Sequence, residues 1–145
     1  MERQDDPFDL NRFVGAQSGT YDLALAELRN GRKDGHWIWF IFPQVAGLGM
    51  SSMSQAYSVT GIDEARAYLA HPLLGPRLRA CFDALLAVDG RTADAILGAV
   101  DAVKVRSSAT LFARADPSDP RFQAVLDRYY GGAADARTDD PARWP

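Results

Sequence analysis

Residues 74–90 read LGPRLRACFDALLAVDG, and this stretch decides the fold class. Its apolar side chains recur at the spacing that places them on one face of an α-helix. The members of this face are Leu74, Leu78, Cys81, Phe82 and Leu85. Gly90 follows at a position where helices commonly end. The pattern predicts a long helix that packs this face into a core.

Similar patterns extend outward on both sides of this helix. Asp6 before Pro7, Thr60 with Asp63, and Asp119 are typical residues for helix starts. Further helices are predicted over residues 6–17, 20–30, 60–71, 92–98, 101–114 and 119–131. Residues 45–54 are predicted as a loop. The fold class is therefore all-α, with six or seven helices and at most one short strand.

The periodic positions also predict the core. These positions share helical spacing and apolar side chains, and they are Phe13, Leu25, Leu28, Leu74, Leu78, Phe82, Leu85, Leu111, Val125 and Leu126. Residues 6–132 are predicted to form a single domain, because no linker or repeat divides them. Residues 133–145 are rich in Asp, Thr and Pro, so we expect a loosely attached tail.

Composition limits the functional classes. The net charge of -3 gives no general attraction to phosphate backbones, so no nucleic-acid partner is expected. The longest apolar run, residues 37–42, is far shorter than the ~20 residues that span a bilayer, so no membrane association is expected. The N-terminus lacks the apolar stretch of a secretory signal. The single cysteine, Cys81, fits a reducing compartment, and the expected location is the cytoplasm.

Several short motifs together resemble the bacterial domain-of-unknown-function family 1810. They are His36-Trp37-x-Trp39-Phe40-x-Phe42-Pro43-Gln44, Gly47-Leu48-Gly49, His71-Pro72-x-Leu74-Gly75, Asp101-x-x-Lys104-x-x-Ser107-Ser108-x-Thr110-Leu111-Phe112 and Tyr129-Tyr130-Gly131. The resemblance implies a compact all-helical domain and favours a helix for the aromatic segment, whose composition alone favours a strand. It implies no catalytic residue. The calpastatin label sometimes given to this family suits disordered repeats poor in aromatics, whereas this chain has three Trp, five Tyr and seven Phe.

Most residues that carry chemistry have a structural explanation. Cys81 lies among leucines and is predicted to be a buried, unreactive core residue. His71 before Pro72 is predicted to interact with a helix end rather than to act as a base. Two histidines and one cysteine are too few for a zinc site, so no metal is expected, and no cofactor motif is present. The glycines of residues 47–52 are predicted to form a plain turn, because the Lys of a phosphate-binding loop is missing.

Two segments remain as candidates for a functional site. Asp101, Lys104 and Ser108 lie on one polar stripe of a helix, and Ser107 adds a second hydroxyl. Asp101 is also explained as a helix cap paired with Lys104. The aromatic segment combines rings with polar neighbours, a composition shared by small-ligand pockets and by ordinary cores. The candidate ligand-binding residues are His36, Trp37, Trp39, Gln44, Lys104, Ser107 and Ser108.

Two functions stay open from the sequence. The first is a small-molecule-binding domain or enzyme, whose Lys and Ser donors and aromatic rings suit a nucleotide or ADP-ribose-like ligand. The second is a non-catalytic module that uses the aromatic patch to bind a protein partner or to self-associate. A concave pocket containing Lys104 and Ser108 would favour the first function, and a flat aromatic patch would favour the second.

Overall fold

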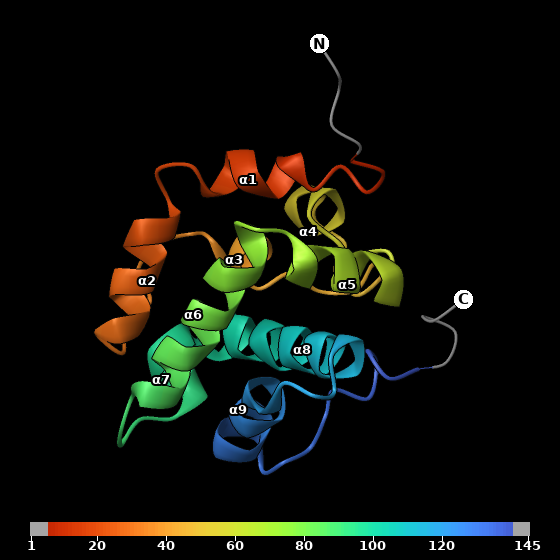
Figure 1. Cartoon of the computed structure of the whole chain (residues 1–145). Helices are drawn as coiled ribbons and strands as arrows, with labels where there is room; N and C mark the ends of the chain where they lie inside the picture. Colours follow the sequence, from red (N-terminus) through yellow and green to blue (C-terminus); the bar gives the residue numbers. More distant parts are fainter. Residues whose placement is uncertain (1–5, 141–145) are drawn as a thin grey trace.

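The computed structural model describes residues 6–140, which contain nine helices and no sheet (Figure 1). The helices are α1 Asn11–Gln17, α2 Tyr21–Arg29, α3 Ile38–Ile41, α4 Ser52–Ala56, α5 Ile62–Ala70, α6 Leu74–Ala87, α7 Ala93–Leu97, α8 Ala99–Ala115 and α9 Pro120–Tyr130. Within these residues the sole extended pairing is an isolated bridge between Val45 and Val59. The chain is all-α, as predicted.

Two short helices account for the higher helix count. Helix α3 lies in the aromatic segment, whose residues show no clear helical period. Helix α4 lies partly in the predicted loop, and Ser51 caps it by accepting a hydrogen bond from the Ser54 N–H at 3.1 Å. A helix of four or five residues shows too little periodicity to be recognised from its pattern.

Helix α8 occupies the middle of the fold. It packs against α9, α7, α5 and α3, and Figure 1 shows α5 and α9 on opposite sides of it. Every residue from 107 to 113 is buried, so this part of α8 has no solvent-facing side. Small side chains at Ser107, Ser108 and Ala109 suit a helix that is surrounded by other elements. Helix α6 packs on α2, α5 and α9 and completes the core.

The predicted core is confirmed. All ten predicted core residues are buried, and Phe13, Leu28, Leu74, Phe82, Leu111, Val125 and Leu126 are fully so. Ring contacts run through the centre of the molecule: Phe82 lies 4.9 Å from Phe42 and 5.2 Å from Phe122, between ring centroids. These edge-to-face arrangements stabilise the core beyond the burial of area alone.

The first helix begins later than predicted. Asp6 does cap it, accepting hydrogen bonds from the N–H groups of Leu10 at 2.7 Å and Asn11 at 3.0 Å. However, Asp9 has a φ of 51°, which is left-handed and incompatible with a continuous helix from residue 7. Helix α1 therefore starts at Asn11. The two N–H donors lower the pKa of Asp6.

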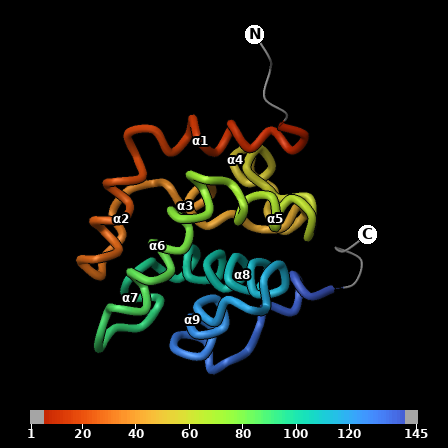
Figure 2. The backbone as a smooth tube through the Cα atoms, in the orientation of Figure 1, coloured from red at the N-terminus to blue at the C-terminus, as the bar shows by residue number. Residues whose placement is uncertain are grey.

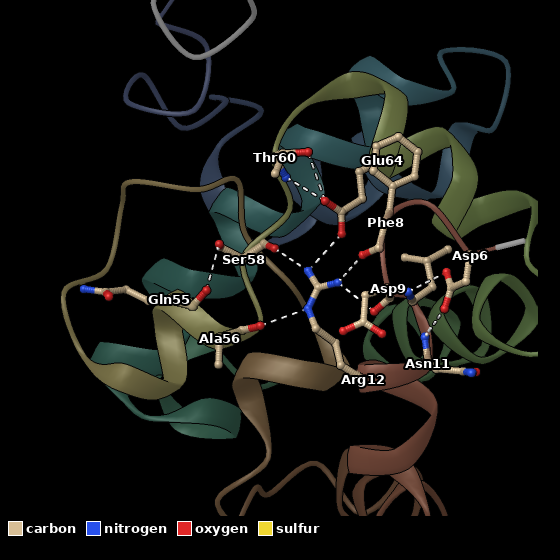
Figure 3. Close-up of polar contacts among 11 residues, drawn as sticks. Asp6, Phe8, Asp9, Asn11, Arg12, Gln55, Ala56, Ser58, Thr60 and Glu64 are labelled. Atoms are coloured by element: carbon tan, nitrogen blue, oxygen red, sulfur yellow. Dashed lines mark hydrogen bonds and ion pairs between the residues drawn. The ribbon is translucent and has the colours of Figure 1, made fainter.

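Arg12 joins three segments of the chain (Figure 3). Its guanidinium donates to the carbonyl oxygens of Ala56 at 2.9 Å and Ser58 at 2.7 Å and pairs with Glu64 at 2.9 Å. The other carboxylate oxygen of Glu64 accepts the N–H and the hydroxyl of Thr60, each at 3.0 Å. Glu64, rather than Asp63, therefore completes the capping arrangement with Thr60. The buried Glu64 carboxylate is fully hydrogen-bonded within the fold.

His71 and Gly75 shape the junction between α5 and α6. His71 follows the last residue of α5, and its Nδ1 accepts hydrogen bonds from the N–H groups of Leu73 at 3.1 Å and Leu74 at 3.2 Å. The imidazole therefore caps the start of α6, whereas we expected it to act at the end of the preceding helix. A side chain at Gly75 would place Cβ 2.2 Å from the Leu69 carbonyl oxygen, so the two helices approach closely at this point.

Residues 133–140 pack on α8, whereas we expected them to be loosely attached. The chain returns from the end of α9 to α8 (Figure 2), where Thr138 is completely buried. Arg114 of α8 forms two hydrogen bonds to the Asp139 carboxylate, at 2.9 and 2.7 Å. Arg106 donates to the Ala133 carbonyl oxygen at 2.9 Å. The packed region thus extends past residue 132, and residues 141–145 of the predicted tail lie outside the described residues.

Candidate functional site

A pocket of about 420 Å³ opens where three separate segments meet. The first turns of α8 form one wall, residues 44–54 form a second, and residues 135–137 form a third. The lining residues are Gln44, Leu48, Gly49, Ser54, Ala99, Val100, Val103, Lys104, Ser107, Asp135 and Arg137. This volume lies within the usual range for small-ligand pockets.

The α8 wall follows directly from helical geometry. Val100, Val103, Lys104 and Ser107 are spaced i, i+3, i+4 and i+7, so they lie on one face. The two valines are 71% and 59% exposed, although they are large apolar residues. The face thus combines an apolar edge with an ammonium group and a hydroxyl.

A chain of hydrogen bonds joins the three walls. Gln44 Nε2 donates to Ser107 Oγ at 3.1 Å, across 63 residues of sequence. Ser107 Oγ in turn lies 3.3 Å from Asp135 Oδ2 and 3.1 Å from Thr138 Oγ1. Arg137 donates to the Leu48 carbonyl oxygen at 3.0 Å and ties the third wall to the second. These bonds fix the polar side of the pocket.

Two lysines share one aspartate beside the pocket. Asp101 Oδ2 lies 2.8 Å from Lys33 Nζ, and Asp101 Oδ1 lies 3.4 Å from Lys104 Nζ. Each ammonium also lies over an indole ring: Lys33 is 4.9 Å from the Trp37 centroid, and Lys104 is 5.3 Å from that of Trp39. Such cation–π contacts hold the ammonium groups without neutralising them.

Glu27 holds the loop that carries Lys33. Its Oε1 accepts the N–H groups of Asp34 and Gly35, both at 2.8 Å, and the indole N–H of Trp37 at 2.9 Å. Burial favours the neutral carboxyl, but the hydrogen bonds from Gly35, Asp34 and Trp37 and the charge of Lys33 together outweigh it, so the pKa of Glu27 is lowered. The ionised carboxylate therefore positions Trp37 beneath Lys33.

Three predicted site residues meet in the pocket wall, and four do not. Gln44, Lys104 and Ser107 line it. Trp39 is half-buried against Lys104 but does not line the pocket. The remaining three lie elsewhere: His36 is exposed outside the pocket, Trp37 is only 1% exposed in the core, and Ser108 is fully buried.

Helical geometry explains why the two serines differ. Adjacent residues on a helix point about 100° apart, and here Ser107 faces the pocket while Ser108 faces the core. Ser108 lies on the core side of α8, and its hydroxyl has no hydrogen-bond partner among the described residues. Ser108 therefore does not join Lys104 in the pocket, although the sequence placed both on one polar stripe, and His36 does not line the pocket either.

Some lining residues were missed from the sequence. Val100 and Val103 could have been found, because they share the helical spacing of Lys104 and Ser107. No local signal identifies Asp135 or Arg137, which follow the last helix in a short polar segment. Leu48 and Gly49 belong to the predicted plain turn, which forms the second wall.

Other candidate chemistries have no geometric support in the described residues. No three His, Cys, Asp or Glu side chains of residues 6–140 are grouped as metal ligands. Cys81 is 1% exposed and lies outside the pocket, and burial raises the pKa of its thiol to about 12. Across the same residues, none of the helices has the length and apolar character needed to cross a bilayer.

Comparison with known proteins identifies the family. The crystal structure of the conserved hypothetical protein Rv1873 from Mycobacterium tuberculosis is 51% identical in sequence, with a TM-score of 0.91. The match covers 92% of this chain and 95% of that chain. Among curated proteins, none matches this sequence. The family model described as "Protein of unknown function (DUF1810)" matches residues 7–141. The chain therefore belongs to the DUF1810 family.

Proposed function

We propose that this chain is a small-molecule-binding domain whose ligand occupies the pocket between α8, residues 44–54 and residues 135–137. One observation carries the proposal: Gln44, Lys104 and Ser107 converge in one concave wall although they come from distant segments. A few polar groups placed in a mainly apolar cavity are typical of ligand sites.

The lining supports binding more directly than catalysis. Asp135 is the acidic residue among the described lining residues. Its Oδ2 accepts the Thr138 N–H at 2.9 Å and also the hydroxyls of Ser107 and Thr138. A carboxylate bonded in this way is held in place and is poorly suited to accept a proton from a ligand. Phosphate-bearing ligands such as nucleotides or ADP-ribose remain suitable, because Lys104 offers an ammonium donor. Trp39 lies outside the wall, so base stacking does not support this choice.

A screen of the purified protein tests the proposal. We expect one class within a panel of nucleotides, sugar phosphates and carboxylic acids to raise the melting temperature. A ligand at 100 times its dissociation constant adds about 2.7 kcal/mol to the free energy of unfolding. If no compound raises the melting temperature, the proposal is wrong.

A matched pair of variants locates the binding site. Val103→Trp places a large ring at the exposed edge of the pocket, and we expect it to abolish the shift. Leu23→Trp is the control, because Leu23 is 52% exposed on α2 and does not line the pocket. A ligand that stabilises both variants equally binds elsewhere and contradicts the proposal.

A second candidate function is self-association or binding to a protein partner. Exposed apolar side chains favour it: Val100 and Val103 lie side by side at the pocket edge. The aromatic segment does not supply this surface, since Trp37, Phe40 and Phe42 are buried. Sedimentation of the wild type and Val103→Asp at increasing concentration tests it, and a monomer in both cases contradicts self-association.

We also propose a cytoplasmic location. The support is chemical: Cys81 is a free, buried thiol, which fits a reducing compartment. Fractionation of cells that express a tagged copy of the chain tests this location.

A further inference from the structure

The charges around the pocket are unequal. Among the lining residues that the structure describes, Lys104 and Arg137 carry positive charge and Asp135 carries negative charge. Asp135 is already hydrogen-bonded to Thr138 and Ser107. The carboxylate that is paired with Lys104 is that of the neighbouring Asp101. Asp101 therefore determines how much of the positive charge of Lys104 is left uncompensated towards the cavity.

Asp101 compensates Lys33 more strongly than Lys104. The Lys33 distance is 2.8 Å and the Lys104 distance is 3.4 Å. The Lys33 side chain is only 7% exposed, whereas that of Lys104 is 22% exposed. Attraction grows as distance and solvent screening decrease, and one carboxylate cannot neutralise two ammonium groups. Lys104 thus retains positive charge on the side that faces the pocket.

The rest of the wall indicates what accompanies the anionic group. Ser107 and Gln44 provide hydrogen-bonding atoms close to Lys104 along the polar side. Leu48, Val100 and Val103 provide an apolar surface. A ligand with one anionic end and one apolar body matches both parts of the cavity.

We infer that the ligand carries a phosphate or carboxylate group bound by Lys104, and that Lys33 strengthens this binding by holding Asp101. The inference rests on the proposed function, because it concerns the same pocket. Lys33 does not line the cavity, so it is a positioning residue that acts through Asp101 and Lys104.

Three probes of similar size test the ligand class: phenyl phosphate, benzoate and benzyl alcohol. Binding is followed by amide chemical shifts of Gly49, Val103, Lys104 and Ser107 in a titration of the whole chain. We expect the better of the two anions to bind about tenfold more tightly than the alcohol, as a charge-assisted hydrogen bond predicts. The stronger anion identifies phosphate or carboxylate as the preferred group.

The outcomes separate this inference from the proposed function. If the alcohol binds as tightly as both anions, the pocket binds small molecules but the anionic class is wrong. If none of the three probes shifts the pocket amides, the inference is contradicted, and the panel screen decides the proposed function separately. Lys104→Met should reduce anion binding to the level of the alcohol, and unchanged anion binding would refute the role of Lys104.

Variants at Asp101 and Lys33 test the positioning role. Asp101→Asn should lower the melting temperature yet tighten anion binding about threefold, because Lys104 loses its competing carboxylate. Lys33→Met should weaken anion binding by a similar factor and leave alcohol binding unchanged. Arg32→Met is the control, since it removes a neighbouring charge whose partner is the exposed Asp34.

A purely structural role cannot produce opposite changes in stability and affinity. Weaker anion binding by Asp101→Asn would therefore overturn the positioning role. Equal effects of Lys33→Met and Arg32→Met would also overturn it, because general charge would then explain both. If Asp101→Asn does not fold, the comparison of Lys33→Met with Arg32→Met still decides the question.

Discussion

Lys33 Nζ lies 2.8 Å from Asp101 Oδ2, and this ion pair fastens the loop after α2 to the first turn of α8. Both side chains are largely buried, with 7% and 18% of their surfaces exposed. The pair therefore has two effects. It holds two segments together that are distant in the sequence, and it influences the charge environment of Lys104 in the pocket.

A double-mutant cycle should show that this pair stabilises the fold. For Lys33→Met and Asp101→Asn we expect a coupling of about 1–2 kcal/mol in the free energy of unfolding, because the charges are shielded from water. Arg32 and Asp34 provide the control, since they are paired at 3.4 Å but are 75% and 66% exposed. Their coupling should be about 0.5 kcal/mol or less. Equal couplings, measured by urea denaturation, would contradict the prediction.

Gly75→Ala should destabilise the protein by about 2–3 kcal/mol, because the added Cβ would lie 2.2 Å from a backbone oxygen that cannot move freely. Gly15→Ala is the matched control inside helix α1, where the added Cβ meets no atom within 4 Å. There the substitution should stabilise by about 0.5 kcal/mol, since alanine favours helix. Thermal unfolding of both variants checks the opposite signs.

Thr138→Val should lower the free energy of unfolding by about 1–2 kcal/mol. The valine keeps the shape but loses the hydroxyl that bonds to Asp135 and Ser107 in a fully buried position. Ser118→Ala is the control, because its hydroxyl is exposed and bonds only locally to Asp116. A Thr138→Val variant as stable as wild type would show that the buried Thr138 hydroxyl does not stabilise the fold.

Cys81 should make the protein less stable in alkali. Burial raises the pKa of its thiol from 9.0 to about 12, so the unfolded chain loses this proton at lower pH than the folded chain. Between pH 9 and 12 the unfolded state then binds fewer protons, and the free energy of unfolding falls as pH rises. Cys81→Ala should reduce that slope by at most about 1.4 kcal/mol per pH unit. Burial of Tyr68 raises its pKa in the same direction, so part of the slope should remain.

The thiol should also react slowly in the folded protein. A disulfide-forming reagent should modify Cys81 at the rate of unfolding, because the side chain is 1% exposed. Rapid modification of the native protein at neutral pH, or an unchanged alkaline slope in Cys81→Ala, would contradict this account of Cys81.

The sequence by itself determined the helices that carry a long apolar face and a cap. Leu74, Leu78 and Leu85 mark one face of α6, and Asp119 caps α9 by accepting the Arg121 N–H at 3.1 Å. These features depend on residues a few positions apart, so local spacing is enough to predict them. The family resemblance also came from short motifs that can be recognised without coordinates.

Only the tertiary structure decided which polar groups meet. The sequence placed Ser107 and Ser108 in one candidate site, but packing turned Ser108 into the core and left Ser107 in the pocket. Asp135 and Thr138 lie in a short segment without periodicity, yet both bond to Ser107, and Asp135 lines the pocket. A hydrogen bond between distant segments depends on how whole helices pack, and no local pattern records that arrangement.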